Sequence, residues 1–268
     1  QTCALPIFLV PGRWHGFDLA RELHARKALT RLVTSYPKVR TRLWGIPDEK
    51  VQSLFWHYLL TRAIWDLGGD ALDIRMGHFL FSCFGRAAAR HGGEANILHA
   101  WAGAGLESLL QPLRSGQVIF VDRASAHRIE QDRIVSEENR KRGRATTRRP
   151  PGMVDRELRE YELCDGVIVP SLFVERSFRK HGFPADRLHR SCLGVNPKNF
   201  PRADGIRPTR FRALYVGSLS LRKGIPYLLE AFQRAGLSDA ELRLVGGNRD
   251  RKSTRLNSSH ANISYAVF

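Results

Sequence analysis

The stretch Gly116-Gln117-Val118-Ile119-Phe120-Val121-Asp122 places four apolar residues in a row between a glycine-led turn and an acidic residue. Such a short apolar run indicates a buried β-strand. Runs of similar form recur at residues 8–10, 97–100, 167–169, 213–216 and 242–245, and residues 17–29 and 51–67 have the apolar spacing of helices. Short apolar strands that alternate with amphipathic helices are typical of parallel sheets covered on both faces. We therefore predict an α/β fold built from doubly wound, Rossmann-like sheets.

Residues 200–208 are rich in proline, glycine and charge, and they lie between two strand–helix patterns. This composition is typical of a linker, and it places a domain boundary near residue 204. Residues 8–203 are long enough for a complete doubly wound domain. Residues 204–250 hold only the first strand, helix and strand of a second Rossmann-like domain.

Both ends of the chain differ in character from the rest. Residues 251–268 are rich in serine and asparagine and have little periodicity, at a point where an open sheet should continue. They resemble translated sequencing-adapter sequence, and residues 1–7 resemble the same kind of artefact. We expect the natural protein to be longer at both ends, and we assign no functional role to residues 1–7 or 251–268.

The chain of 268 residues carries 43 lysines and arginines against 26 acidic residues, a formal net charge of +17. This excess excludes an acidic solvating protein and indicates anionic partners such as nucleotides, phosphates, nucleic acids or membrane surfaces. No stretch reaches the roughly 18 apolar residues of a membrane span. Four scattered cysteines and a start without a basic region before its apolar residues predict a cytoplasmic protein.

Two smaller features have modest implications. The segment 139–149 has six basic residues and no acidic one, so it is either a solvated loop or a loop that contacts a phosphate or lipid headgroup. His99 has no second histidine or cysteine at ligand spacing, and no metal site is expected there.

The stretch 214–232 is the most informative about chemistry. A strand is expected to end at Gly217, where ligands of open α/β sheets approach the backbone, and a helix is expected to start near Pro226. Arg222 and Lys223 stand just before this helix, whose N-terminal amide groups and dipole favour anions. Two such cations predict a diphosphate pocket; the alternative is that both are ordinary surface cations. The spacing of a P-loop is absent.

Residues 216–225 resemble the donor-binding motif of group 1, or family 4, glycosyltransferases with the GT-B fold. Further segments are similar to the same family: its interdomain region at 164–171, 173–178, 182–184, 193–196 and 200–201, and other parts at 12–20, 34–37 and 122–127. In all, the resemblance spans about residues 8–247.

The resemblance implies a GT-B fold and transfer of a sugar from a nucleotide diphosphate sugar to a glycan or lipid-linked acceptor, with retention of configuration and without a cofactor or metal. Arg222 and Lys223 would neutralise the departing diphosphate, whose charge preplaced cations stabilise most in the transition state. Gly217 and Ser218 would line the same phosphates. The family's E-x7-E motif would lie beyond residue 250, so we expect this chain to have little or no transferase activity.

In the first domain the resemblance places Gly12, Arg13 and His15 in a loop on the acceptor side of the interdomain cleft. This chain has one glycine there followed by Arg13, whose side-chain cation would replace backbone contacts to an anion. His15 is alternatively a structural residue at the start of the next helix.

Asp122 lies where the family often has an active-site histidine. It forms either a local ion pair with Arg123 or a polar group that orients the acceptor hydroxyl, with His127 close by. The predicted catalytic residues are therefore Arg222, Lys223, Asp122 and His127.

Two other functional classes stay open as alternatives. A nucleic-acid-binding protein fits the charge, but helix-turn-helix, zinc-finger and RNP-type signatures are absent, and four basic residues fall in or beside the tail. A nucleotide-sugar epimerase needs a G-x-x-G-x-x-G turn after the first strand, which is absent. The expected partners are a nucleotide-sugar donor, a glycan or lipid-linked acceptor and, through the basic charge, an anionic membrane surface.

Overall fold

The computed structural model describes residues 5–112, 116–144, 150–197 and 210–247. The chain divides into two compact units: Gln1–Arg133 with Thr147–Gly194, and Ile134–Thr146 with Val195–Phe268. The predicted linker at 200–208, the boundary at 204 and the tail at 251–268 lie outside the described residues.

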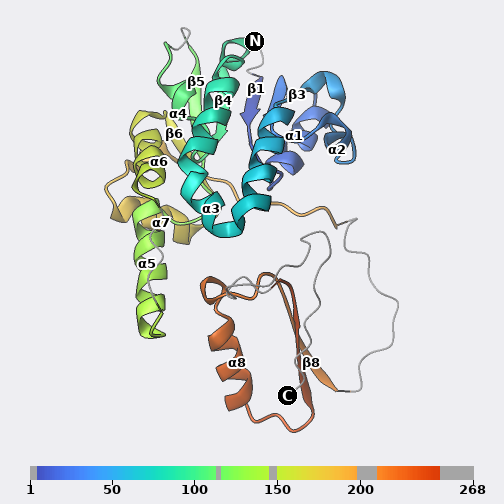
Figure 1. Ribbon diagram of the computed structural model, residues 1–268, viewed down its shortest axis with the longest axis vertical. Helices are drawn as coiled ribbons and strands as arrows, with labels where there is room; N and C mark the ends of the chain where they lie inside the picture. The colour runs from blue at the N-terminus through green and yellow to red at the C-terminus, as the bar shows by residue number, and fades with distance from the viewer. Residues whose placement is uncertain (1–4, 113–115, 145–149, 198–209, 248–268) are drawn as a thin grey trace. The chain divides into compact units, whose positions relative to one another are not determined.

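The first unit is built on one sheet of seven parallel strands in the order β3-β2-β1-β4-β5-β6-β7 (Figure 1). The strands are β1 (Pro6–Leu9), β2 (Arg31–Thr34), β3 (Val51–Ser53), β4 (Ile97–Trp101), β5 (Val118–Asp122), β6 (Gly166–Val169) and β7 (Leu188–Arg190). Because the strand order reverses between β1 and β4, the carboxyl ends of these two strands flank the switch point at which open α/β sheets bind ligands. The predicted α/β fold with a doubly wound parallel sheet is confirmed.

Burial along the central strands shows that both faces of this sheet are covered. Ile7, Phe8 and Leu9 follow one another in β1 and are all almost fully buried, although successive strand residues point to opposite faces. Pro6 and Ile7 form the first half of β1, so the structure gives two residues of the expected artefact segment 1–7 a place in the sheet.

The helices of the first unit connect these strands. They are α1 (Gly16–Ala25), α2 (Lys38–Arg42), α3 (Phe55–Ala89), α4 (Leu106–Leu109), α5 (Arg128–Lys141), α6 (Pro151–Leu163) and α7 (Leu172–Lys180); the part of α5 from Ile134 onward belongs to the second unit. Figure 1 shows α3 as two arms that meet at a bend. The bend coincides with Gly69, whose φ of +58° interrupts the helical backbone and suits a residue without a Cβ.

The predicted helix over residues 51–67 is wrong at its start. Val51 to Ser53 form β3, and α3 begins only at Phe55. Val51 is buried in the sheet beside Leu32 of β2. Tertiary pairing therefore outweighs the helical spacing that Val51 shares with the apolar residues after it.

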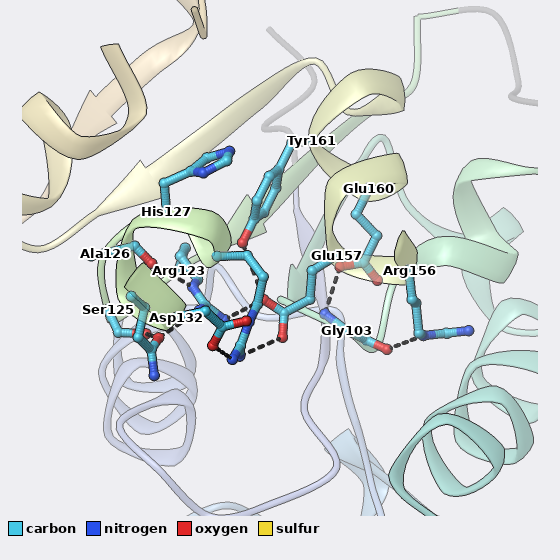
Figure 2. Close-up of polar contacts among 12 residues, drawn as sticks. Gly103, Arg123, Ser125, Ala126, His127, Asp132, Arg156, Glu157, Glu160 and Tyr161 are labelled. Carbon is cyan, nitrogen blue, oxygen red and sulfur yellow. Dashed lines mark hydrogen bonds and ion pairs between the residues drawn. The ribbon is translucent and has the colours of Figure 1, made fainter. Parts of the chain in front are cut away.

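One buried carboxylate of α6 holds the loop between β4 and α4 (Figure 2). Glu160 is fully buried and accepts hydrogen bonds from three backbone N–H groups, those of Gly103, Gly105 at 2.8 Å and Leu106 at 2.9 Å. One turn earlier, Arg156 donates to the carbonyl of Gly103 and pairs with Glu107 of α4. The loop thus has polar partners from α6 for its amide and carbonyl groups.

Burial raises the pKa of Glu160 to about 7, against the opposing effects of the Gly103 N–H, the Arg156 charge and the Gly105 N–H. Both protonation states therefore exist near neutral pH, and in either state a carboxyl oxygen is available to accept from the loop.

The second unit contains a β-α-β arrangement. Strands β8 (Phe211–Val216) and β9 (Ala240–Val245) pair in parallel, and the short 3₁₀ turn η5 (Leu221–Lys223) and helix α8 (Ile225–Arg234) connect them. Leu242 and Leu244 of β9 are buried, whereas Leu214 and Val216 of β8 are more than half exposed.

We predict that Glu160→Ala lowers the free energy of unfolding by about 3 kcal/mol, because three loop N–H groups lose their acceptor in a buried environment. Denaturant unfolding of the variant measures this loss. Glu162→Ala, an exposed position on the same helix, is the matched control and should change the free energy by less than about 0.5 kcal/mol. Equal effects of the two substitutions would contradict the role of Glu160.

Candidate functional site

Three polar side chains meet at the carboxyl ends of the three neighbouring strands β1, β4 and β5. Asp122, the last residue of β5, lies beside Trp101 in the register with β4. Its Oδ2 accepts a hydrogen bond from His99 Nε2 at 2.9 Å, and His15 Nε2, from the loop after β1, lies 3.4 Å from the same oxygen. Because an ionised carboxylate only accepts, both histidines present a protonated Nε2 to Asp122.

The local electrostatics keep Asp122 ionised. Burial raises the pKa of its carboxyl, but the hydrogen bonds and charges of His15 and His99 act in the opposite direction and leave the pKa below its ordinary value. Asp122 and His99 are buried, whereas the side chain of His15 is 23% exposed. His15 is therefore the member of this cluster that a ligand in solvent can reach.

Asp122 does not pair with Arg123, and that sequence-based alternative is wrong. The Arg123 guanidinium instead lies 2.6 Å from Glu157 of α6, as Figure 2 shows. Successive residues at the end of a strand point to opposite faces, so Asp122 meets β4 and the loop after β1 while Arg123 meets α6.

Two tryptophans form a wall beside this cluster. Trp14 stacks on Trp101 with ring centroids 5.3 Å apart and planes 14° apart, and the His15 ring lies 4.2 Å from Trp101. Trp14 has a φ of +26°, a backbone conformation that is costly for a bulky residue and is concentrated at functional sites. A Cβ on Gly12 would come within 3.1 Å of the Trp14 ring, so a larger residue there would displace this ring slightly.

Arg13, the third predicted residue of the acceptor-side loop, points to a different neighbour. Its guanidinium lies 4.2 Å from the centre of the Trp44 ring, a distance suited to a cation–π interaction. Two residues of the loop after β1 therefore have different neighbours. His15 lies against Asp122, and Arg13 lies against Trp44 in the segment after α2.

The structure places His127 in a separate aromatic cluster, and the expectation that it joins Asp122 in one catalytic group is not supported. Its ring stacks on His181 at 4.5 Å and contacts Tyr161 and Phe178. The side chain is buried, and its Nδ1 has no hydrogen-bond partner among the described residues. Burial lowers the pKa of His127 to about 4, and the charges of His181 and Arg123 add to this effect while Glu130 opposes it.

In the second unit, the residues after β8 form a compact turn before α8. The Gly217 N–H donates to Val245 at 2.8 Å, and Tyr215 donates from its hydroxyl to the Ser218 carbonyl at 2.9 Å. A Cβ on Gly246 would lie 1.7 Å from the Gly217 carbonyl oxygen, so the two backbones approach as only glycine allows.

Arg222 and Lys223 lie in η5, directly before Gly224 and the first residue of α8. Both side chains are exposed, and within the part of the chain that the structure describes neither takes part in an ion pair. An α-helix of ten residues starts beside them, so two cations and the positive end of a helix dipole act on the same region.

The structure describes part of the basic segment at 139–149. Residues 139–141 of the basic segment form the end of α5, where Lys141 pairs with Glu137 and Glu138, while residues 145–149 lie outside the described residues. Among the described side chains, no group of three or more histidine, cysteine or acidic residues is arranged to hold a metal ion. No described helix has the length and apolar character needed to cross a bilayer.

His99, Trp14 and Trp101 belong to the site although sequence reasoning did not select them for it. The signal that identifies them is structural: β4 lies between β1 and β5, so its last residues contact both the loop after β1 and Asp122. The apolar run at 97–100 indicated the strand, but the pairing partners of a parallel strand are distant in sequence.

Comparison with known proteins shows the fold. No protein-family model matches the chain, and no curated protein matches it. Among solved structures, the HepE protein of Anabaena in complex with UDP is 14% identical, with a TM-score of 0.54 over 92% of this chain and 62% of HepE. The calicheamicin glycosyltransferase CalG4 is 17% identical, with a TM-score of 0.44 over 93% of this chain and 66% of CalG4.

A third solved structure, described as a UDP-N-acetylglucosamine 2-epimerase of Listeria monocytogenes, is 11% identical, with a TM-score of 0.44 over 90% of this chain and 62% of that protein. The chain spans about three fifths of the length of HepE. The fold is therefore α/β and GT-B-like, with a seven-stranded Rossmann-like unit and a β-α-β unit.

We predict that His127→Phe removes an acid sensitivity of the fold. Because burial holds the pKa of His127 at about 4, below its ordinary 6.5, the folded state binds fewer protons than the unfolded chain between these values, and stability is lost as the pH falls through them. Unfolding free energies measured at pH 7 and pH 4 should show the variant gaining up to about 3 kcal/mol over the parent at pH 4.

The exposed His189, replaced by Phe, is the control for the exchange of an imidazole for a phenyl ring. A His127→Phe difference of the same size at pH 7 and pH 4 would contradict the assignment.

Proposed function

We propose that this chain is part of a glycosyltransferase that moves a sugar from a nucleotide diphosphate sugar to an acceptor hydroxyl. The observation that carries the proposal is the pair of exposed cations, Arg222 and Lys223, that the turn after β8 holds directly before the N-terminus of α8. The GT-B-like fold supports it, because HepE, the similar solved structure, is described in complex with UDP.

The second unit would hold the donor. As the sugar–phosphate bond breaks, negative charge grows on the leaving diphosphate, and cations already in place stabilise that charge more in the transition state than in the ground state. Arg222 offers a planar fork of donors and Lys223 a compact ammonium. Ser218 would face the same phosphates through its hydroxyl group. Gly217, whose N–H already donates to Val245, would let the phosphates approach the backbone because it has no Cβ.

The first unit would hold the acceptor. Asp122 stays ionised and holds the Nε2–H of His15, which leaves the other ring nitrogen of this partly exposed histidine for an acceptor hydroxyl. A histidine oriented in this way by a carboxylate can accept the hydroxyl proton or position the hydroxyl for attack. His99 is a positioning residue, because it acts on the reaction only through Asp122.

Three details of the proposed reaction rest on the sequence resemblance to family 4 glycosyltransferases. They are retention of anomeric configuration, activity without a metal, and a glycan or lipid-linked acceptor of the cell envelope.

We predict that Arg222→Ala and Lys223→Ala each raise the dissociation constant for UDP by about tenfold, as expected for the loss of one charge-assisted contact. Isothermal titration of the chain with UDP measures this change. Arg234→Ala removes an exposed cation from the other end of α8 and should leave the constant within about twofold. Unchanged binding in both turn variants, or an equal loss in the control, would overturn the donor assignment.

A further inference from the structure

An exposed apolar surface lies on the first unit. It consists of five side chains that are between 43% and 83% exposed: Val39, Leu43, Phe55, Trp56 and Leu59. We call these five residues the apolar patch. Single exposed apolar residues are ordinary on a protein surface, but contiguous ones mark sites of interaction.

The topology brings the two parts of the patch together. Helix α2 follows β2, α3 follows β3, and these strands pair with Thr34 beside Ser53, so both helices begin at the same edge of the sheet. The Arg40 guanidinium lies 6.0 Å from the centre of the Tyr58 ring, and the Tyr58 ring stacks on Phe55 at 5.8 Å. Val39 and Leu43 are four residues apart and lie on the same side of α2.

The opposite side of the first arm of α3 packs against the rest of the first unit. His57 accepts from the Ser35 hydroxyl at 2.8 Å and donates to the Leu80 carbonyl at 2.9 Å, and Ile64 is buried. The first arm of α3 therefore packs one side against the unit and presents Phe55, Trp56 and Leu59 on the other, which is the pattern of an amphipathic helix with an apolar outer stripe.

Positive charge lies beside the α2 part of the patch. Helix α2 has three basic residues and no acidic one, and residues 38–66 contain five lysines and arginines against three acidic residues. Arg42 pairs with Asp48 at 3.0 Å and Arg62 pairs with Asp66 at 3.1 Å, while the exposed Lys38 and Arg40 flank Val39. Apolar side chains flanked by cations complement a layer of anionic headgroups over an apolar interior.

We propose that the apolar patch docks the protein onto the surface of an anionic lipid bilayer, with Trp56, Leu59, Val39 and Leu43 entering the headgroup boundary and Lys38 and Arg40 contacting the headgroups. The protein lies on the bilayer in this arrangement, since no described helix can cross one. Aliphatic side chains such as Leu43, 83% exposed, favour lipid over nucleic acid, which is bound by cations and flat rings. The proposal does not depend on the proposed transferase activity.

The test is co-sedimentation of the 268-residue chain with vesicles of phosphatidylcholine alone or with one third phosphatidylglycerol. We expect binding to the anionic vesicles and about 100-fold weaker binding after the double substitution Lys38→Glu and Arg40→Glu, since each cation near the surface contributes about tenfold or less and reversal adds repulsion. Trp56→Ser with Leu59→Ser should weaken the same binding by at least about tenfold.

The matched control is Leu172→Ser with Phe173→Ser, two exposed apolar residues at the start of α7, and it should bind anionic vesicles like the parent. Circular dichroism checks that each variant is folded. A salt titration of the unsubstituted chain gives a result independent of any variant, with release from anionic vesicles as the salt rises.

Three results would overturn the proposal. The first is equal binding to neutral and anionic vesicles. The second is anionic-vesicle binding that neither double variant weakens more than the control does. The third is absence of vesicle binding together with evidence for a different partner. Such evidence is either salt-sensitive binding of a DNA duplex that the Lys38→Glu, Arg40→Glu variant loses, or a dimer in size-exclusion chromatography that the Trp56→Ser, Leu59→Ser variant dissociates.

Discussion

The site in the first unit depends on one buried carboxylate that lies outside it. Glu160 accepts from the backbone N–H groups of Gly103, Gly105 and Leu106, and it thereby fixes the chain that leaves the carboxyl end of β4. Trp101 is the last residue of that strand and His99 is two residues before it. The pairing of β4 with β1 and β5 sets the positions of His99 and Trp101, and the contact from α6 fixes the loop that follows them. Glycine at residue 103, with a φ of +91°, allows the loop to turn into this carboxylate.

The charged groups of the two units lie in different environments. In the first, Asp122 is buried, and the hydrogen bonds of His15 and His99 compensate the loss of water around it, so the carboxylate can orient a neighbour without moving. In the second, Arg222 and Lys223 are exposed, and no ion pair with another described residue neutralises their charges, which are available to an incoming anion. Fixed polar groups such as those around Asp122 suit a hydroxyl group, and exposed cations such as Arg222 and Lys223 suit a phosphate.

Much of the fold was predictable because the strands of a covered parallel sheet are continuous apolar runs. The runs at 118–121, 167–169, 213–216 and 242–245 are all strands in the structure. Residues 51–53 were missed because Val51 also fits a helical stripe, and only pairing with β2 decides between the two. Only part of the Asp122 cluster was predictable from the sequence. The end of an apolar run identified Asp122, but its contacts with His15 and His99 follow from the order of strands β1, β4 and β5. His127 follows Asp122 closely in sequence, yet the turn after β5 directs it toward α6 and α7.

A crystal structure of the chain with UDP would show where the diphosphate binds. We expect the diphosphate at the start of α8, with phosphate oxygens within about 3.2 Å of the Arg222 guanidinium and the Lys223 ammonium. Density for the nucleotide elsewhere on the protein, with both side chains turned to solvent, would contradict it.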